Sequence, residues 1–150
     1  MTFKDITHPT YQEVHDICVL VSVQIKCSPN MLGYKHIMGI SRGGLIPAVI
    51  MSHLLDLPLI TVDYSSKNGE GDKIHVNKLP NLFITHLPIL LVDDVAGSGS
   101  TIREIRSHYG TGVVDTFVVI NKSQYPTDYG YKAPLGTGWI TFPWETWKTK

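Results

Sequence analysis

The sequence has few cysteines, no excess of charge of either sign and no long apolar run. Cys18 and Cys27 are too few and too widely spaced for a CxxC redox pair or a zinc pair, so we expect two reduced, structural thiols. Thirteen basic residues balance thirteen acidic ones, which argues against nucleic acid as the main partner, because nucleic-acid binders usually carry a basic face. No apolar run approaches the roughly 18 residues of a membrane span, and the N-terminus lacks a secretory core. We therefore expect a cytoplasmic protein without a membrane span.

The length and the composition favour one globular domain over 1–150. Hydrophobic residues make up 43% and charged residues 17% of the chain, a balance typical of folded rather than disordered proteins. A chain of 150 residues can bury an ordinary core but is too short for two domains.

Helical and extended patterns alternate along the chain, which predicts an α/β fold. Thr10 and Glu13 have the spacing of a capping box, and the apolar helical stripe that follows them ends before Pro29. Further helices are expected at 45–55 and from 101 to about 110, and strands at 36–40, 58–62, 88–92 and 113–120. Because the strands are continuously apolar rather than alternating, we predict a mostly parallel sheet flanked by helices on both faces.

The turn from Gly97 to Thr101 lies between an apolar strand and a helix, and its residues suit a phosphate monoester. Gly97 and Gly99 let the backbone approach a ligand, and the N–H groups of 98–101 lie where the helix dipole favours an anion. The hydroxyls in the turn add further donors. An ordinary strand–turn–helix with a capping serine is the alternative interpretation.

Two adjacent carboxylates, Asp93 and Asp94, come directly before this turn. Placing them together is costly unless cations or hydroxyls meet them, which suggests sugar hydroxyls and Mg²⁺.

A second loop, 41–44, also follows a predicted strand. Its Arg42 offers a planar donor fork to a diphosphate, although an arginine there also suits a surface ion pair. Ligands of parallel sheets bind at the carboxyl ends of the strands, so both loops can face one crevice. Residues 39–43 also match the G-x-S-x-G pattern of serine hydrolases, but that interpretation leaves the turn at 97–101 unexplained.

The motifs resemble, in the same order, those of type I phosphoribosyltransferases, and most of all the bacterial xanthine-guanine members. The apolar strand, the acid pair and Gly97–Thr101 resemble the family's phosphoribosyl-diphosphate signature. Ile40–Pro47 is similar to its pyrophosphate loop, and Trp139–Glu145 to the end of its purine pocket. The resemblance covers about 37–145 and implies that fold, with a small purine-binding hood from the C-terminal segment.

The resemblance also implies an activity and partners. Purine-salvage members transfer the 5-phosphoribosyl group from phosphoribosyl diphosphate to a 6-oxopurine (hypoxanthine, guanine or xanthine), release diphosphate and commonly form homodimers or homotetramers. In these implied roles Asp93, Asp94 and Arg42 are the catalytic residues, Asp94 holds Mg²⁺, Lys122 points at the 6-oxo group and Trp139 stacks on the ring. The substrate-binding residues implied are Ser41, Arg42, Gly43, Gly44, Asp93, Asp94, Val95, Ala96, Gly97, Ser98, Gly99, Ser100, Thr101, Lys122, Trp139 and Ile140.

Two positions depart from the family pattern. Gly97 stands where purine-specific members usually carry an aspartate placed to take the N7 proton, and Thr141 where an acid grips the 2-amino group of guanine. Loss of an acid–base partner lowers the rate on the order of a hundredfold or more. The alternative function is therefore a non-catalytic phosphoribosyl-diphosphate sensor or regulatory protein. The polar stretch 63–80 suits either a lid over the site or an ordinary surface loop.

Overall fold

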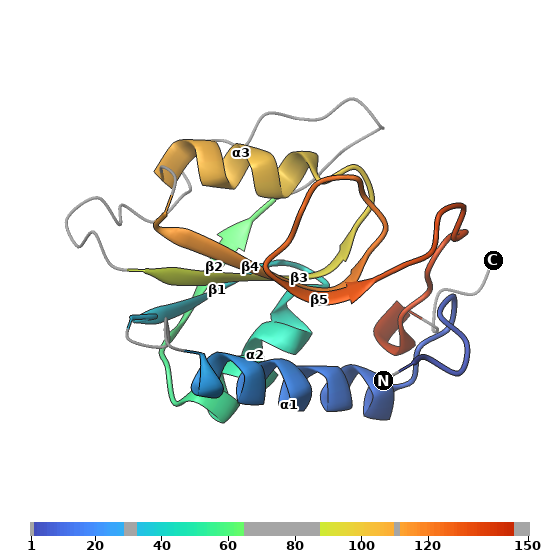
Figure 1. Cartoon of the computed structure of the whole chain (residues 1–150), viewed down its shortest axis with the longest axis horizontal. Coiled ribbons are helices and arrows are strands. Elements are labelled where there is room, and N and C mark those ends of the chain that lie inside the picture. Colours follow the sequence, from blue (N-terminus) through green and yellow to red (C-terminus); the bar gives the residue numbers. More distant parts are fainter. Residues whose placement is uncertain (1, 29–32, 65–87, 110–111, 146–150) are drawn as a thin grey trace.

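The computed structural model describes residues 2–28, 33–64, 88–109 and 112–145. Over these ranges five strands form one sheet in the order β2-β1-β3-β4-β5, and every neighbouring pair is parallel (Figure 1). The strands are β1 (His36–Ser41), β2 (Leu59–Asp63), β3 (Ile89–Ala96), β4 (Val114–Asn121) and β5 (Tyr129–Lys132). The predicted parallel sheet is confirmed.

Helices cover both faces of the sheet, as the apolar strands predict. The helices α1 (Tyr11–Cys27) and α2 (Leu45–Leu55) lie on one face and α3 (Ser100–Tyr109) lies on the other (Figure 1). The capping box at the start of α1 is present: Glu13 N donates to Thr10 Oγ1 at 3.2 Å, and Thr10 N donates to Glu13 Oε2 at 2.8 Å. None of the helices in the described ranges is long and apolar enough to cross a bilayer.

The core has two parts, one on each face of the sheet. On the α1–α2 face, buried side chains of both helices pack with Leu90 and Phe117. On the α3 face, Ile102 and Ile105 pack with Leu91 and other strand residues. Because both faces of the central strands are covered, these strands are apolar at nearly every position.

The two cysteines differ in their surroundings. Cys18 lies fully buried in the core beneath α1, and burial raises the pKa of its thiol to about 12. Cys27 is exposed, so the prediction that both are structural thiols is wrong for Cys27.

The sequence interpretation placed one strand end wrongly and missed two short elements. We expected the acid pair to close the strand after Val92, but β3 continues to Ala96 because its residues stay in register with β4 as far as Asn121. The short edge strand β5 and the 3₁₀ turn Pro143–Glu145 were not predicted, since neither has an apolar run. Most of the predicted lid, from 65 onward, lies outside the described ranges.

Replacing Phe117 on β4 with alanine should lower the free energy of unfolding by about 3–5 kcal/mol, because a fully buried ring is lost and a cavity remains. Urea denaturation followed by circular dichroism measures the change. Leu135→Ala, at a side chain that is 83% exposed, should change it by less than about 0.5 kcal/mol. Similar losses in the two variants would contradict this account of the core.

Candidate functional site

The carboxyl ends of β1, β3 and β4 bring the predicted loops to one edge of the sheet. β1 leads into the loop 41–44, and β3 leads into the turn 97–101. Just after β4, the backbone N–H of Lys122 donates to the carbonyl of Ala96 at 2.9 Å. The loop that carries Lys122 is therefore tied to the end of β3.

The glycine loop after β1 packs directly on the two carboxylates. A Cβ added to Gly43 would lie 1.8 Å from Oδ2 of Asp94, and one added to Gly44 would lie 2.9 Å from Oδ1 of Asp93. Any side chain at these positions would displace the acids, so the close approach depends on glycine. The structure thus brings together the two loops that the sequence assigned to one crevice.

The remaining residues of this loop lie at its rim. Ser41 Oγ donates to Asp63 Oδ1 at 3.0 Å, and the peptide bond between Ser41 and Arg42 is cis. The Arg42 side chain is exposed, so its guanidinium is accessible from solvent.

Few groups of the protein offset the negative charge of the acid pair, Asp93 and Asp94. Burial raises the pKa of Asp93, and the charge of Asp94 raises it further. Burial also raises the pKa of Asp94, and the charge of Glu145 adds to this effect. Backbone N–H groups donate to both carboxylates, at 2.9 Å from Asp94 to Asp93 and at 2.8 Å from Val95 to Asp94. Within the described ranges, no lysine or arginine forms an ion pair with either acid.

These carboxylates fit a magnesium ion that takes its other ligands from a substrate. Mg²⁺ is usually bound by one or two carboxylates together with substrate phosphates and water. The described part of the chain contains no group of three or more potential metal ligands, so the protein would supply only part of the coordination shell.

The turn after β3 forms the N-terminus of α3. Ser98 Oγ accepts from the Ser100 N–H at 3.3 Å and donates to Ser100 Oγ at 2.9 Å. Gly99 has a positive φ of 79°, and a Cβ there would lie 2.5 Å from Cβ of Tyr125. Gly97 is exposed, with no atom of the described residues within 4 Å of the place where its Cβ would lie, and Thr101 is half-buried. An anion at this helix N-terminus would meet backbone donors and the positive end of the dipole.

Two residues predicted to bind substrate direct their side chains into the core. Ala96 is buried among the residues under α3, and Val95 packs against the core on the opposite face. Their contribution to a ligand would therefore be limited to the backbone.

The C-terminal segment lies beside Lys122. Lys122 Nζ donates to the carbonyl of Gly138, and the neighbouring Trp139 is 81% exposed. This exposure excludes Trp139 from the core and leaves its indole open to solvent. Ile140 is buried in the core instead and anchors the segment.

A hollow of about 420 Å³ lies beside β5 rather than over the acid pair. Polar groups of its lining residues already have partners: Asn121 Nδ2 donates to Thr127 Oγ1 at 3.2 Å and to the carbonyl of Tyr125 at 3.0 Å, and Lys132 Nζ donates to the carbonyl of Ser123. Among the described residues, the predicted binding groups converge at the glycine–carboxylate contact instead, which makes that contact the candidate site.

Comparison with known families decides which family this arrangement represents. The family model described as "Phosphoribosyl transferase domain" matches residues 27–147, a range that includes all three loops. The chain belongs to the phosphoribosyltransferase family.

Individual phosphoribosyltransferases support the same assignment. The chain is 31% identical to the xanthine-guanine phosphoribosyltransferase of Cereibacter sphaeroides over 121 residues, which cover 78% of this chain and 72% of that protein. It is 29% identical to the enzyme of the same name from Gluconobacter oxydans, over 75% and 70% of the two chains. The crystal structure of a purine phosphoribosyltransferase from Pyrococcus horikoshii superposes with a TM-score of 0.73, at 26% identity and over 96% of both chains.

Sequence reasoning missed several residues around the phosphoribosyltransferase site. Ser123 and Tyr125 contact the turn through Gly99, and nothing in their local sequence pattern indicates a contact more than twenty positions away. Glu145 acts on the pKa of Asp94 through space and was noticed only as part of the Trp139–Glu145 motif.

Asp93→Asn should stabilise the ligand-free protein at neutral pH. A carboxyl whose pKa rises on folding from its ordinary value of 3.8 destabilises the folded state increasingly as the pH rises from about 4 through the folded-state pKa. Asparagine avoids this loss and keeps the acceptor for the Asp94 N–H. The variant should be more stable than the wild type at pH 7, and the difference should shrink as the pH falls toward 4.

Urea denaturation in EDTA, repeated from pH 4 to pH 8, measures this difference. The matched control is Asp16→Asn, at an exposed acid on α1, which should show no comparable pH-dependent gain. A variant at Asp93 that is less stable than the wild type at pH 7 would show that the carboxylate is compensated.

Proposed function

We propose that this phosphoribosyltransferase acts in purine salvage, transferring the 5-phosphoribosyl group from phosphoribosyl diphosphate to a 6-oxopurine with release of diphosphate. The observation that carries the proposal is the direct packing of the glycine loop on Asp93 and Asp94, next to a helix N-terminus that suits a phosphate. The purine and xanthine-guanine phosphoribosyltransferases that the chain resembles support the same reaction.

Each end of the donor has its own binding groups in this proposal. Asp93 and Asp94 accept hydrogen bonds from the ribose hydroxyls, and the N–H and hydroxyl groups of 97–101 hold the 5′-phosphate. Arg42 and the amides of the loop 41–44 hold the diphosphate. A bound Mg²⁺, held by Asp94, would supply positive charge to the leaving diphosphate.

The purine would lie between Lys122 and Trp139. Lys122 Nζ, already held by the carbonyl of Gly138, has three N–H donors and can also reach a 6-oxo group. The exposed indole of Trp139 offers a stacking surface, with Ile140 anchoring the segment behind it.

The transfer exchanges one bond for another at carbon 1 of the ribose. The bond to diphosphate breaks with its electron pair leaving on the diphosphate, and a purine ring nitrogen forms the new bond through an oxocarbenium-like transition state. The bond is formed by the imidazole nitrogen that carries no proton, and N7 of the purine then gives up its proton to water, since Gly97 supplies no acceptor. The protein contributes mainly orientation and electrostatic stabilisation.

The choice of purine and the assembly are finer parts of the proposal. Thr141 offers no carboxylate to a 2-amino group, so we expect hypoxanthine to be used at least as well as guanine. We also propose a cytoplasmic homodimer or homotetramer of one-domain chains. Apolar side chains exposed on α1 and α2 offer surface that such an assembly would bury: Val19, Leu20, Val23, Ile46 and Val49. A lid over 63–80 stays a prediction.

The double variant Asp93→Asn/Asp94→Asn should lose the stabilisation that the donor gives. With Mg²⁺ and phosphoribosyl diphosphate at about 100 times its Kd, the wild type should gain about 2.7 kcal/mol of stability, measured as a rise in Tm, and the double variant should gain little. Glu104→Gln on α3, which removes an acid outside the loops, serves as a control that keeps the shift. A melting shift that persists in the double variant would show that these carboxylates do not bind the donor.

Gly97→Asp should raise the kcat of nucleotide formation, by about tenfold or more, if the missing proton acceptor limits the rate. A Cβ at this position meets no atom of the described part of the chain within 4 Å, so the substitution should not disturb its packing. A spectrophotometric assay with hypoxanthine, guanine and xanthine measures kcat, and Gly97→Asn controls for size without a proton acceptor. An unchanged or lower rate counts against this explanation. Tight donor binding without any nucleotide formed would instead indicate a sensor.

A further inference from the structure

Tyr125, which is outside the predicted site, lies directly against the turn 97–101, the proposed phosphate turn. The Cβ that Gly99 lacks would sit 2.5 Å from Cβ and 3.2 Å from Cγ of Tyr125, so the backbone of the turn rests on this side chain. Ser123 supports the same place, with Oγ 3.1 Å from the added Cβ. Tyr125 is half-buried and packs with the core beneath α3.

The ring of Tyr125 is also held from the helix side. The guanidinium carbons of Arg103 and Arg106, one turn apart on α3, lie 5.3 Å and 6.0 Å from its ring centroid. Both distances are within the range of cation–π attraction. Arg103 N in turn donates to the carbonyl of Gly99 at 3.0 Å. Tyr125 therefore contacts the turn and the helix that the turn begins.

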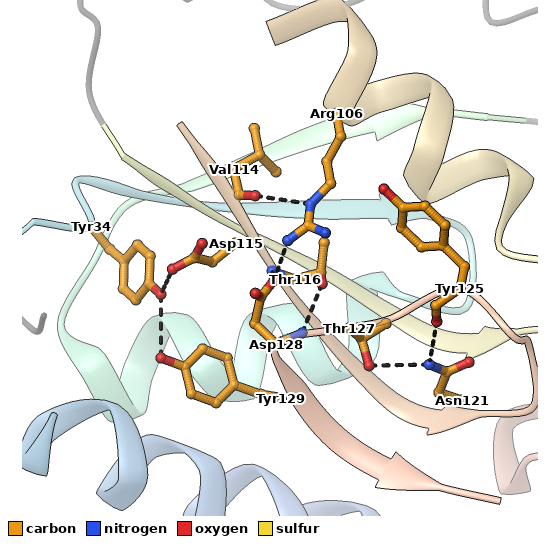
Figure 2. Close-up of polar contacts among 10 residues, drawn as sticks. All are labelled: Tyr34, Arg106, Val114, Asp115, Thr116, Asn121, Tyr125, Thr127, Asp128 and Tyr129. Carbon is orange, nitrogen blue, oxygen red and sulfur yellow. Dashed lines mark hydrogen bonds and ion pairs between the residues drawn. The ribbon is translucent and has the colours of Figure 1, made fainter. Parts of the chain in front are cut away.

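The segment that carries Tyr125 is cross-linked by hydrogen bonds. Ser123 Oγ donates to Asn121 Oδ1 at 2.7 Å and accepts from Tyr125 N at 3.2 Å, and Asn121 Nδ2 donates to the carbonyl of Tyr125 at 3.0 Å (Figure 2 shows the last contact). Lys122, the residue assigned to the purine, lies inside this segment. Its position is consequently fixed relative to Tyr125.

The far end of the segment is anchored to α3 and β4. Arg106 forms an ion pair with Asp128, and Asp128 Oδ2 also accepts from the N–H and the hydroxyl of Thr116 at 2.8 Å and 2.9 Å (Figure 2). Arg106 Nε donates to the carbonyl of Val114 at 3.1 Å. Movement of Tyr125 away from the turn would thus strain contacts at both ends of the segment.

We propose that Tyr125 is a positioning residue, which fixes the 5′-phosphate turn relative to the purine-binding Lys122 through its contact with Gly99. This inference rests on the proposed function. The donor is anchored by its phosphate while the base is held near Lys122, so the reacting atoms meet only if these two anchors are in register. A misplacement of about 1 Å can lower a rate about a hundredfold.

The test is a graded series at this position: Tyr125→Phe, Tyr125→Leu and Tyr125→Ala. Isothermal titration of ribose 5-phosphate should give a Kd within about twofold of the wild type for phenylalanine, which keeps the ring, and about tenfold higher for alanine. In the nucleotide assay, alanine should raise the KM for phosphoribosyl diphosphate and lower kcat. The KM for hypoxanthine should change little, because Lys122 remains bonded to Ala96 and Gly138. Tyr125→Leu should give the same changes in Kd, KM and kcat as Tyr125→Ala.

A stability-matched control separates positioning from simple destabilisation. Ile105→Val removes a buried methylene group from α3 without touching the turn, so it should lower Tm and leave the Kd unchanged. If the alanine and leucine variants lower Tm but bind ribose 5-phosphate like the wild type, Tyr125 is merely structural and the proposal is wrong. If Tyr125→Ala does not fold, the same comparison is made with Tyr125→Leu. If the wild type itself does not bind ribose 5-phosphate, the proposed function fails, and this inference fails with it.

Discussion

The direct contact between the backbone of the loop 41–44 and the carboxylates of Asp93 and Asp94 is the constraint on which the site depends. It exists because β1 and β3 are parallel neighbours, so their carboxyl ends meet at the same edge. It leaves no room for a side chain at Gly43 or Gly44. Burial of the two adjacent acids costs solvation, and hydroxyl groups or a cation that reached them would offset this cost.

The rest of the structure is stabilised by the packing of the helices on the sheet. Apolar side chains on both faces of β3 and β4 form the interior, and Asp93 and Asp94 lie toward the carboxyl end of β3. The hydrogen bond from the N–H of Lys122 to the carbonyl of Ala96 continues the contact between β3 and β4 one residue beyond the paired strands. Loops that would otherwise move independently are thereby joined at the backbone.

The features that could be predicted from the sequence are those whose pattern lies within a short stretch of neighbouring residues. The helix α2 begins and ends where the apolar pattern predicted, and the capping box at Thr10 formed as its spacing indicated. The acid pair and the glycine turn were recognisable because their chemistry is concentrated in adjacent residues. The roles of Tyr125 and Asp128 were not recognisable, because both residues act through contacts with α3, which lies about twenty residues earlier in the sequence. The strand β5 is too short and too exposed to have a pattern of its own.

The empty space around Gly97 has an evolutionary consequence. None of the described residues lies where a Cβ at this position would be, so packing among them places little constraint on the occupant. Some glycine codons differ from an aspartate codon by a single nucleotide, and such an exchange would need no compensating change in these residues. The scaffold can therefore be inherited intact whichever of the two residues stands in the turn.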